Sequence, residues 1–129
     1  MRRIHALISL VALGATASLQ AHHAPAVFDQ SKTIVVEGTV TEFVWQNPHS
    51  WIRMDVVDAD GKTTNWSMEM NPPTYLIRSG WKATTLKPGD KIRVVANPLR
   101  TGEPSGKFIN VTLPDGRVLG EADPILGEK

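Results

Sequence analysis

The chain has 129 residues, with 14 Lys and Arg, 13 Asp and Glu, and no cysteine. This length fits one domain of ordinary size with a hydrophobic core of its own. The lack of cysteine excludes disulfide bonds, thiolate metal sites and cysteine nucleophiles.

The first 21 residues have the pattern of a secretory signal peptide. Arg2 and Arg3 form a charged start, and residues 4–17 are mostly apolar but shorter than the roughly 20 residues that span a bilayer. Leu19-Gln20-Ala21 ends on a small residue, as a cleavage site does. We therefore predict a signal peptide over residues 1–21 and a periplasmic or secreted protein. The alternative is an uncleaved anchor, which the short apolar stretch disfavours.

Cleavage after Ala21 would leave a nearly neutral chain of 108 residues. Two of the 14 basic residues leave with the signal, so 12 basic residues face 13 acidic ones. Such a balance provides no basic surface for a phosphate backbone, and we expect no nucleic-acid partner. No later segment is apolar enough over about 20 residues to span a membrane.

The mature chain is predicted to have three parts: a lead-in over residues 22–32, a folded domain over residues 33–119, and a flexible tail over residues 120–129. Pro25 argues against helix in the lead-in, and Phe28 is its one large apolar residue. The domain opens with a strand, Thr33–Val44, rich in β-branched residues. Gly38 in its middle predicts a bulge or a sharp coil.

Alternating apolar residues predict strands over Ile52–Val57 and Thr63–Met70, joined by a tight turn at Asp60-Gly61. Asn71 as N-cap and the prolines after it predict a short helix that stops at Gly80. Two more strands follow, at residues 91–96 and 107–113.

This order, three strands, a short helix and two strands, predicts a mainly β protein with a five-stranded OB-like barrel. The alternative is another small β-sandwich or barrel with a similar number of strands.

Three histidines remain after cleavage, and they are candidate metal ligands: His22, His23 and His49. An N-terminal His22 would offer its α-amine and imidazole together, and imidazole suits Cu(II), Ni(II) and Zn(II). If the lead-in folds back to the loop that holds His49, the three side chains form one site, with copper the foremost metal. The alternative is a solvated terminus and a turn histidine bonded to backbone.

Three methionines, Met54, Met68 and Met70, could bind Cu(I) through their thioethers. Their alternation with apolar neighbours instead favours a place in the barrel core.

The turn between the first two strands holds candidate contacts for a ligand or partner: Trp45, Asn47 and Trp51. Exposed aromatic residues on an OB barrel can stack on a ligand, although both tryptophans could instead cap the core. Glu37, Glu42 and Glu69 are scattered over strands, and no activated nucleophile is evident, so an enzyme is not indicated. An open cleft with His49 hydrogen-bonded to a carboxylate would favour an enzyme instead. The sequence thus predicts an exported binding module for a small ligand, with copper or another divalent metal as the candidate. The alternative is a domain that contacts another exported protein or a polymer through the face at Trp45 and Trp51, without metal.

A set of short motifs is spread along the chain. They are Ala21-His22-His23, Phe28-Asp29, Glu37-Gly38-Thr39-Val40, Trp45–Trp51, Asp60-Gly61-Lys62, Trp66, Gly80-Trp81, Leu86–Asp90 and Leu113–Arg117. This set resembles a family of small exported bacterial proteins known only as a domain of unknown function, with Asn-Pro-His-x-Trp its most specific motif. The resemblance covers nearly all of the mature chain. It implies an exported OB-like domain and no established activity.

Overall fold

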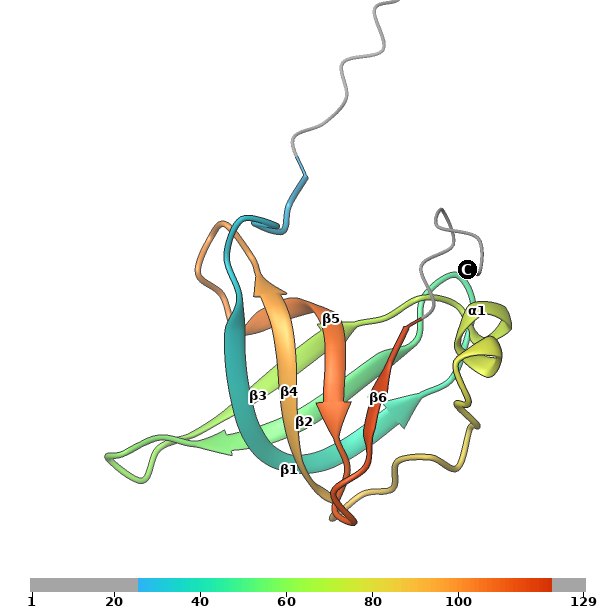
Figure 1. Ribbon diagram of the computed structural model, residues 1–129. Helices are drawn as coiled ribbons and strands as arrows, with labels where there is room; N and C mark the ends of the chain where they lie inside the picture. Colours follow the sequence, from blue (N-terminus) through green and yellow to red (C-terminus); the bar gives the residue numbers. More distant parts are fainter. Residues whose placement is uncertain (1–25, 122–129) are drawn as a thin grey trace, which may run out of the picture.

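The structure, a computed structural model, describes residues 26–121. Six strands and one helix follow one another along the chain (Figure 1). They are β1 (Ile34–Val44), β2 (Trp51–Val57), β3 (Thr63–Glu69), α1 (Pro73–Arg78), β4 (Lys91–Pro98), β5 (Ser105–Thr112) and β6 (Val118–Gly120). Within these residues no helix has the length and apolar character needed to cross a bilayer.

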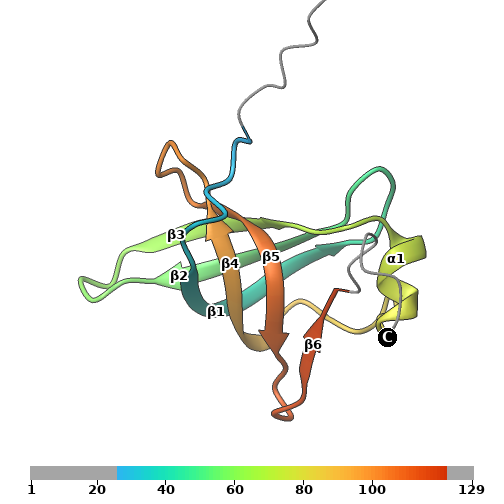
Figure 2. The ribbon, with the colours of Figure 1, turned by 45° about the horizontal axis from the view of Figure 1, so that its top comes forward.

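The strands form one sheet in the order β3-β2-β1-β4-β5-β6, and a parallel pairing between β3 and β5 closes it into a five-stranded barrel. Figure 2 shows the long, curved β1 that makes closure possible. Residues 34–39 of β1 pair with β4, and residues 39–44 pair with β2. The prediction of a mainly β, OB-like barrel with a helix between the third and fourth strands is confirmed.

Gly38 lies where β1 passes from one partner to the other. It pairs with Ile92 of β4, and the next residue, Thr39, pairs with both Lys91 and Asp55. A Cβ atom at Gly38 would overlap the carbonyl oxygen of Asp55. The predicted bulge is displaced: it lies three residues later, between Val40 and Glu42. Gly38 is thus required by close approach of β1 to β2.

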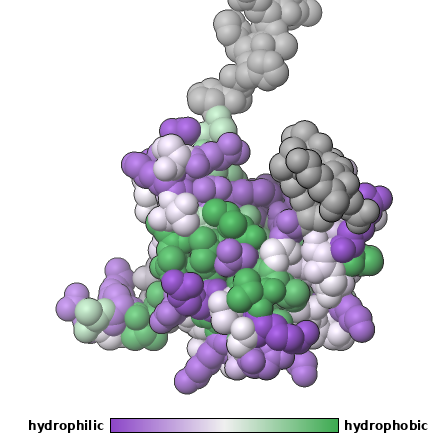
Figure 3. All heavy atoms as spheres, viewed as in Figure 1, coloured by the Kyte–Doolittle hydropathy of each residue, from purple (hydrophilic) through white to green (hydrophobic). Residues whose placement is uncertain are grey.

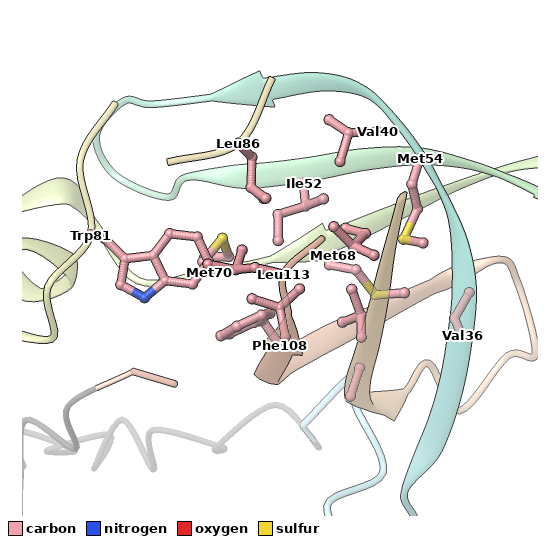
Figure 4. Close-up of a cluster of buried hydrophobic side chains, with 14 of the residues drawn as sticks. Val36, Val40, Ile52, Met54, Met68, Met70, Trp81, Leu86, Phe108 and Leu113 are labelled. Carbon is pink, nitrogen blue, oxygen red and sulfur yellow. The ribbon is translucent and has the colours of Figure 1, made fainter. Parts of the chain in front are cut away.

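The core fills the barrel from all five strands and from the segment after α1 (Figure 4). Met54, Met68 and Met70 are fully buried there, which confirms their predicted place in the core. Trp81 is 1% exposed and lies 5.7 Å from Phe43 and 5.6 Å from Phe108, measured between ring centroids. Its indole therefore plugs the end of the barrel beside α1.

The turns follow their sequence signals, with one correction at the start of α1. The Gly61 and Gly80 residues have φ angles of 78° and 86°, as predicted for the hairpin and for the end of the helix. At that end, Gly80 donates to Ile77 O and Trp81 donates to Leu76 O, a Schellman motif. The predicted N-cap, Asn71, is wrong, because Pro72 occupies that position without a side-chain bond.

The lead-in packs against the connection between β4 and β5. Phe28 forms a β-bridge with Leu99, and Arg100 donates from its backbone to Val27 O and from Nε to Ala26 O. Phe28 therefore docks the lead-in on the barrel. Residues 22–25 lie outside the described residues.

The folded domain extends past the predicted boundary at Leu119. The short strand β6 pairs with β5. Gly120 O accepts a hydrogen bond from Trp81 Nε1 at 2.8 Å, and Glu121 Oε1 accepts one from the Asn71 amide at 2.7 Å. Gly120 and Glu121, which are predicted to lie in the tail, therefore belong to the domain. Residues 122–129 lie outside the described part of the chain.

Apolar side chains also appear on the outside of the barrel. Figure 3 shows them over the face formed by β1, β4 and β5. Val35 of β1, at 49% exposed, and Ile109 of β5, at 37%, belong to it. Exposed apolar residues are normal on a folded protein.

Candidate functional site

The loop between β1 and β2 lies beside α1 (Figures 1 and 2). It is fixed there by backbone bonds to the end of β3: Met70 N donates to Ser50 O at 2.9 Å, and Ser50 N donates to Asn71 O at 3.4 Å. Ser50 is fully buried. These bonds extend the β2–β3 ladder by one residue beyond the Trp51–Glu69 pair. The residue before Ser50, His49, is thereby held against the end of β3.

The His49 ring faces two oxygen atoms of that strand end. Its Nδ1 lies 3.2 Å from Met70 O and 3.4 Å from Glu69 Oε1. A carbonyl oxygen can only accept, so Nδ1 must carry the proton when His49 bonds to Met70. In the neutral ring, Nε2 then keeps its lone pair. The His49 side chain is 44% exposed, so this nitrogen belongs to an accessible side chain.

Three side chains form a row across the outer surface of the barrel: Trp51 of β2, Glu69 of β3 and Lys107 of β5. Trp51 pairs with Glu69, and Glu69 pairs with Lys107. Their neighbours Ile52 and Met68 are fully buried, so the row faces away from the core. His49 meets this row at Glu69.

Glu121 approaches the same cluster from the end of β6. Burial raises the pKa of its carboxyl group, and the negative charge of Glu69 raises it further. The hydrogen bond from Asn71 and the positive charges of Lys107 and His49 act in the opposite direction and lower it. Positive charge near His49 is therefore favourable for an ionised Glu121.

The structure describes one of the three predicted metal ligands. His49 is in the geometry just described, while His22 and His23 lie outside the described residues. Among residues 26–121, no group of three His, Asp or Glu side chains is arranged to hold a metal ion. A metal site at His49 therefore needs ligands from beyond this range or from solvent.

The two predicted aromatic contact residues, Trp45 and Trp51, differ in what they pack against. Trp45 packs on the core and meets Phe43 edge-to-face, with ring centroids 5.7 Å apart. Asn47 is exposed and Trp51 is half-buried in the outer row. Both tryptophans are half-buried, and of the two Trp45 is the one that packs against the core.

Residues 8–108 match the family of unknown function DUF6152, which is more than half of the chain. The chain belongs to this family. No curated protein and no solved structure matches it significantly.

The DUF6152 match includes His22, His23, His49 and Glu69. It ends within β5. Glu121 lies beyond it. Sequence reasoning missed both Glu69 and Glu121 as parts of the site. The alternation of β3 does assign Glu69 to the outer face, but only its register with Trp51 reveals the contact with His49. Nothing local marks Glu121.

An open groove of about 890 Å³ lies elsewhere, beside the bend of β1. Its walls come from β1, β2, β4 and β5, and include Glu37, Asp55, Lys91 and Arg93. His49, Glu69 and Glu121 do not line it. The histidine–carboxylate contact and this groove are therefore separate features.

Proposed function

We propose that this protein is an exported, periplasmic or secreted binding module that holds a divalent transition-metal ion, copper foremost, at His49. His22 and His23 would supply the other protein ligands. We propose binding without catalysis, because the groove that could enclose a substrate lies away from His49. Export rests on the signal-like pattern of residues 1–21.

One observation carries the metal proposal: His49 Nδ1 faces Met70 O at 3.2 Å and Glu69 Oε1 at 3.4 Å. Metal-binding histidines usually donate their second ring N–H to a carboxylate or a backbone carbonyl, which fixes the tautomer and the ring orientation. His49 has both kinds of acceptor on Nδ1. Among residues 26–121 both contacts of the ring are made by Nδ1, so the Nε2 lone pair would be free to bind a metal ion.

The position of the lead-in supports a contribution from the N-terminus. Ala26 is bonded to Arg100 in the connection that leads into β5. From there β5 runs along β3, with Ser105 opposite Ser67 and Lys107 opposite Glu69. Four residue steps separate His22 from Ala26 and span at most about 14 Å. Ala26, the first described residue of the lead-in, is therefore docked beside the connection into β5, the strand that pairs with β3.

Titration of the mature protein with Cu(II), followed by visible absorption and paramagnetic resonance, tests this proposal. His49→Ala should weaken binding at least tenfold, and one extra residue before His22 should remove the α-amine from the site and weaken binding as well. Glu37→Gln, a charge change in the separate groove, is the control and should bind as wild type. Equal affinity in all four proteins would refute the proposal.

A second candidate function is binding of another exported protein, a polymer or a small ligand on the outer row, without metal. The alignment of Trp51 with Glu69 and Lys107 favours it, since an aromatic surface flanked by charged groups suits a mixed apolar and polar partner. Trp51→Ala should lose a partner that the wild type captures from exported proteins. Val57→Ala, on the same strand and 64% exposed, should retain it. Equal capture by both variants would refute this candidate.

A further inference from the structure

We propose that Glu121 is a positioning residue for His49 and that it acts through one peptide group, the amide between Met70 and Asn71. This inference rests on the proposed function, because it concerns how His49 is prepared to bind a metal ion. Glu121 is not a ligand in this proposal. It strengthens the bond that orients the ligand.

The two ends of the same amide carry the two contacts. On one side, the carbonyl oxygen of Met70 lies 3.2 Å from His49 Nδ1. On the other, the N–H of Asn71 donates to Glu121 Oε1 at 2.7 Å. The chain of bonds therefore runs from the carboxylate, through the peptide, to the imidazole.

A carboxylate bonded to an amide N–H increases the polarisation of that amide. Hydrogen bonds linked in this way strengthen one another, by roughly 10–30% per bond. The Met70 oxygen becomes a better acceptor, so Nδ1–H is held more firmly and Nε2 becomes more electron-rich. Metal-site histidines commonly receive this support from a carboxylate in direct contact. Here the peptide transmits it, and Glu69, at 3.4 Å, adds a longer direct contact.

The surrounding bonds hold this arrangement in place. The Met70 side chain is fully buried, and its amide N–H donates to Ser50 O at 2.9 Å. Trp81 Nε1 donates to Gly120 O at 2.8 Å, which fixes the residue directly before Glu121. The carboxylate, the peptide and the ring are thus each anchored to the barrel.

The charges around Glu121 also favour a link between this carboxylate and a metal ion at His49. Positive charge on Lys107, and on the His49 ring when that ring is protonated, lowers the pKa of Glu121, while burial and Glu69 raise it. A cation held on Nε2 would add positive charge to a cluster that contains two carboxylates. Binding of that cation and ionisation of Glu121 therefore favour each other.

The test compares the mature wild type with Glu121→Gln in two experiments. In the metal-free proteins, nitrogen NMR of the imidazole should show faster solvent exchange of the His49 Nδ1 proton in the variant. Titration with Zn(II), a diamagnetic probe, should show affinity lower by roughly three- to tenfold, the range expected for removing one nearby unit charge. Glu103→Gln, an exposed change in the β4–β5 connection, is the control for charge and should match wild type in both.

The outcomes separate the two proposals. If Zn(II) binds equally to wild type and His49→Ala, the proposed function fails, and the metal-free NMR still tests the role of Glu121. If His49 is needed for Zn(II) but Glu121→Gln changes neither the proton exchange nor the affinity, this inference alone fails. Trp81→Phe, which releases Gly120, is the second variant should Glu121→Gln not fold. It should speed the same proton exchange, and an unchanged rate would overturn the inference.

Discussion

Replacement of Gly38 by Ala should destabilise the barrel strongly, because the backbone of β2 lies too close to this residue for a side chain. The new Cβ would overlap the Asp55 carbonyl oxygen and would also lie 3.0 Å from the Met54 methyl carbon. Met54 can adjust its rotamer, but the oxygen belongs to the backbone of β2 and cannot move alone. Overpacking of a core typically costs about 1–3 kcal/mol, and a backbone clash belongs at the upper end, near 3 kcal/mol.

Two other glycines provide a graded comparison. A Cβ at Gly106 would lie 2.9 Å from Ala96 Cβ and 3.0 Å from Asn97 O, so Gly106→Ala should lose about 1–2 kcal/mol. A Cβ at Gly120 meets nothing nearer than 3.5 Å. Gly120→Ala should be neutral or gain up to about 1 kcal/mol, because alanine restricts the unfolded chain.

Urea and thermal unfolding followed by circular dichroism measure all three variants. A loss of about 3 kcal/mol corresponds to a Tm lower by roughly 12–24 °C for a domain of this size. A Gly38→Ala variant that loses less than about 1 kcal/mol, or no more than Gly120→Ala, would refute the close approach of β1 to Asp55.

Three further predictions concern contacts made by the first and last residues that the structure describes. Trp81→Phe should lower the free energy of unfolding by about 1–2 kcal/mol, because it loses the bond to Gly120 O and part of a buried ring; unchanged urea denaturation would contradict this. Burial raises the pKa of the Glu121 carboxyl, so the protonated carboxyl stabilises the folded state. This stabilisation is complete below the ordinary glutamate pKa and is lost as the pH rises through the folded-state pKa. The stability of wild type relative to Glu121→Gln should therefore decline from acid to neutral pH, and a constant difference in urea unfolding across that range would argue against burial of the carboxyl. Arg100→Ala removes the bond to Ala26 O, so hydrogen exchange should quicken at residues 26–28 and stay slow in the core strands; equal protection of the lead-in would count against its docking by Arg100.

The barrel strands could be predicted from the sequence because their signals are local. Ile52 and Met54 alternate with polar residues, and both are fully buried as expected. The strand β6 was missed because three residues after a turn are too few to show a period. Asn71 was misassigned as a helix cap because the preference of asparagine for that position competes here with Pro72.

The site was only partly predictable, because its contacts join distant parts of the chain. His49 was identified by its residue type and its place in a turn. Glu69 is 20 residues away in sequence, and Glu121 is 72 residues away. Both reach the site only through strand register and barrel closure, which no local pattern encodes.

The parallel contact between β3 and β5 has a consequence for local opening of the barrel. It joins only Ser67–Glu69 to Ser105–Lys107, whereas the β2–β3 ladder has seven paired positions. Among the five ladders that close the barrel this one is the shortest, so it should separate first in local opening, well before the barrel unfolds as a whole. Because Glu69 is the last residue of that ladder, each opening would separate Glu69 from Lys107, the residue opposite it in β5, and would weaken the support of the His49 ring. A ligand bound at His49 would therefore hold the β3–β5 contact closed. Hydrogen exchange should then slow at the β3 and β5 amides far more than at those of β1.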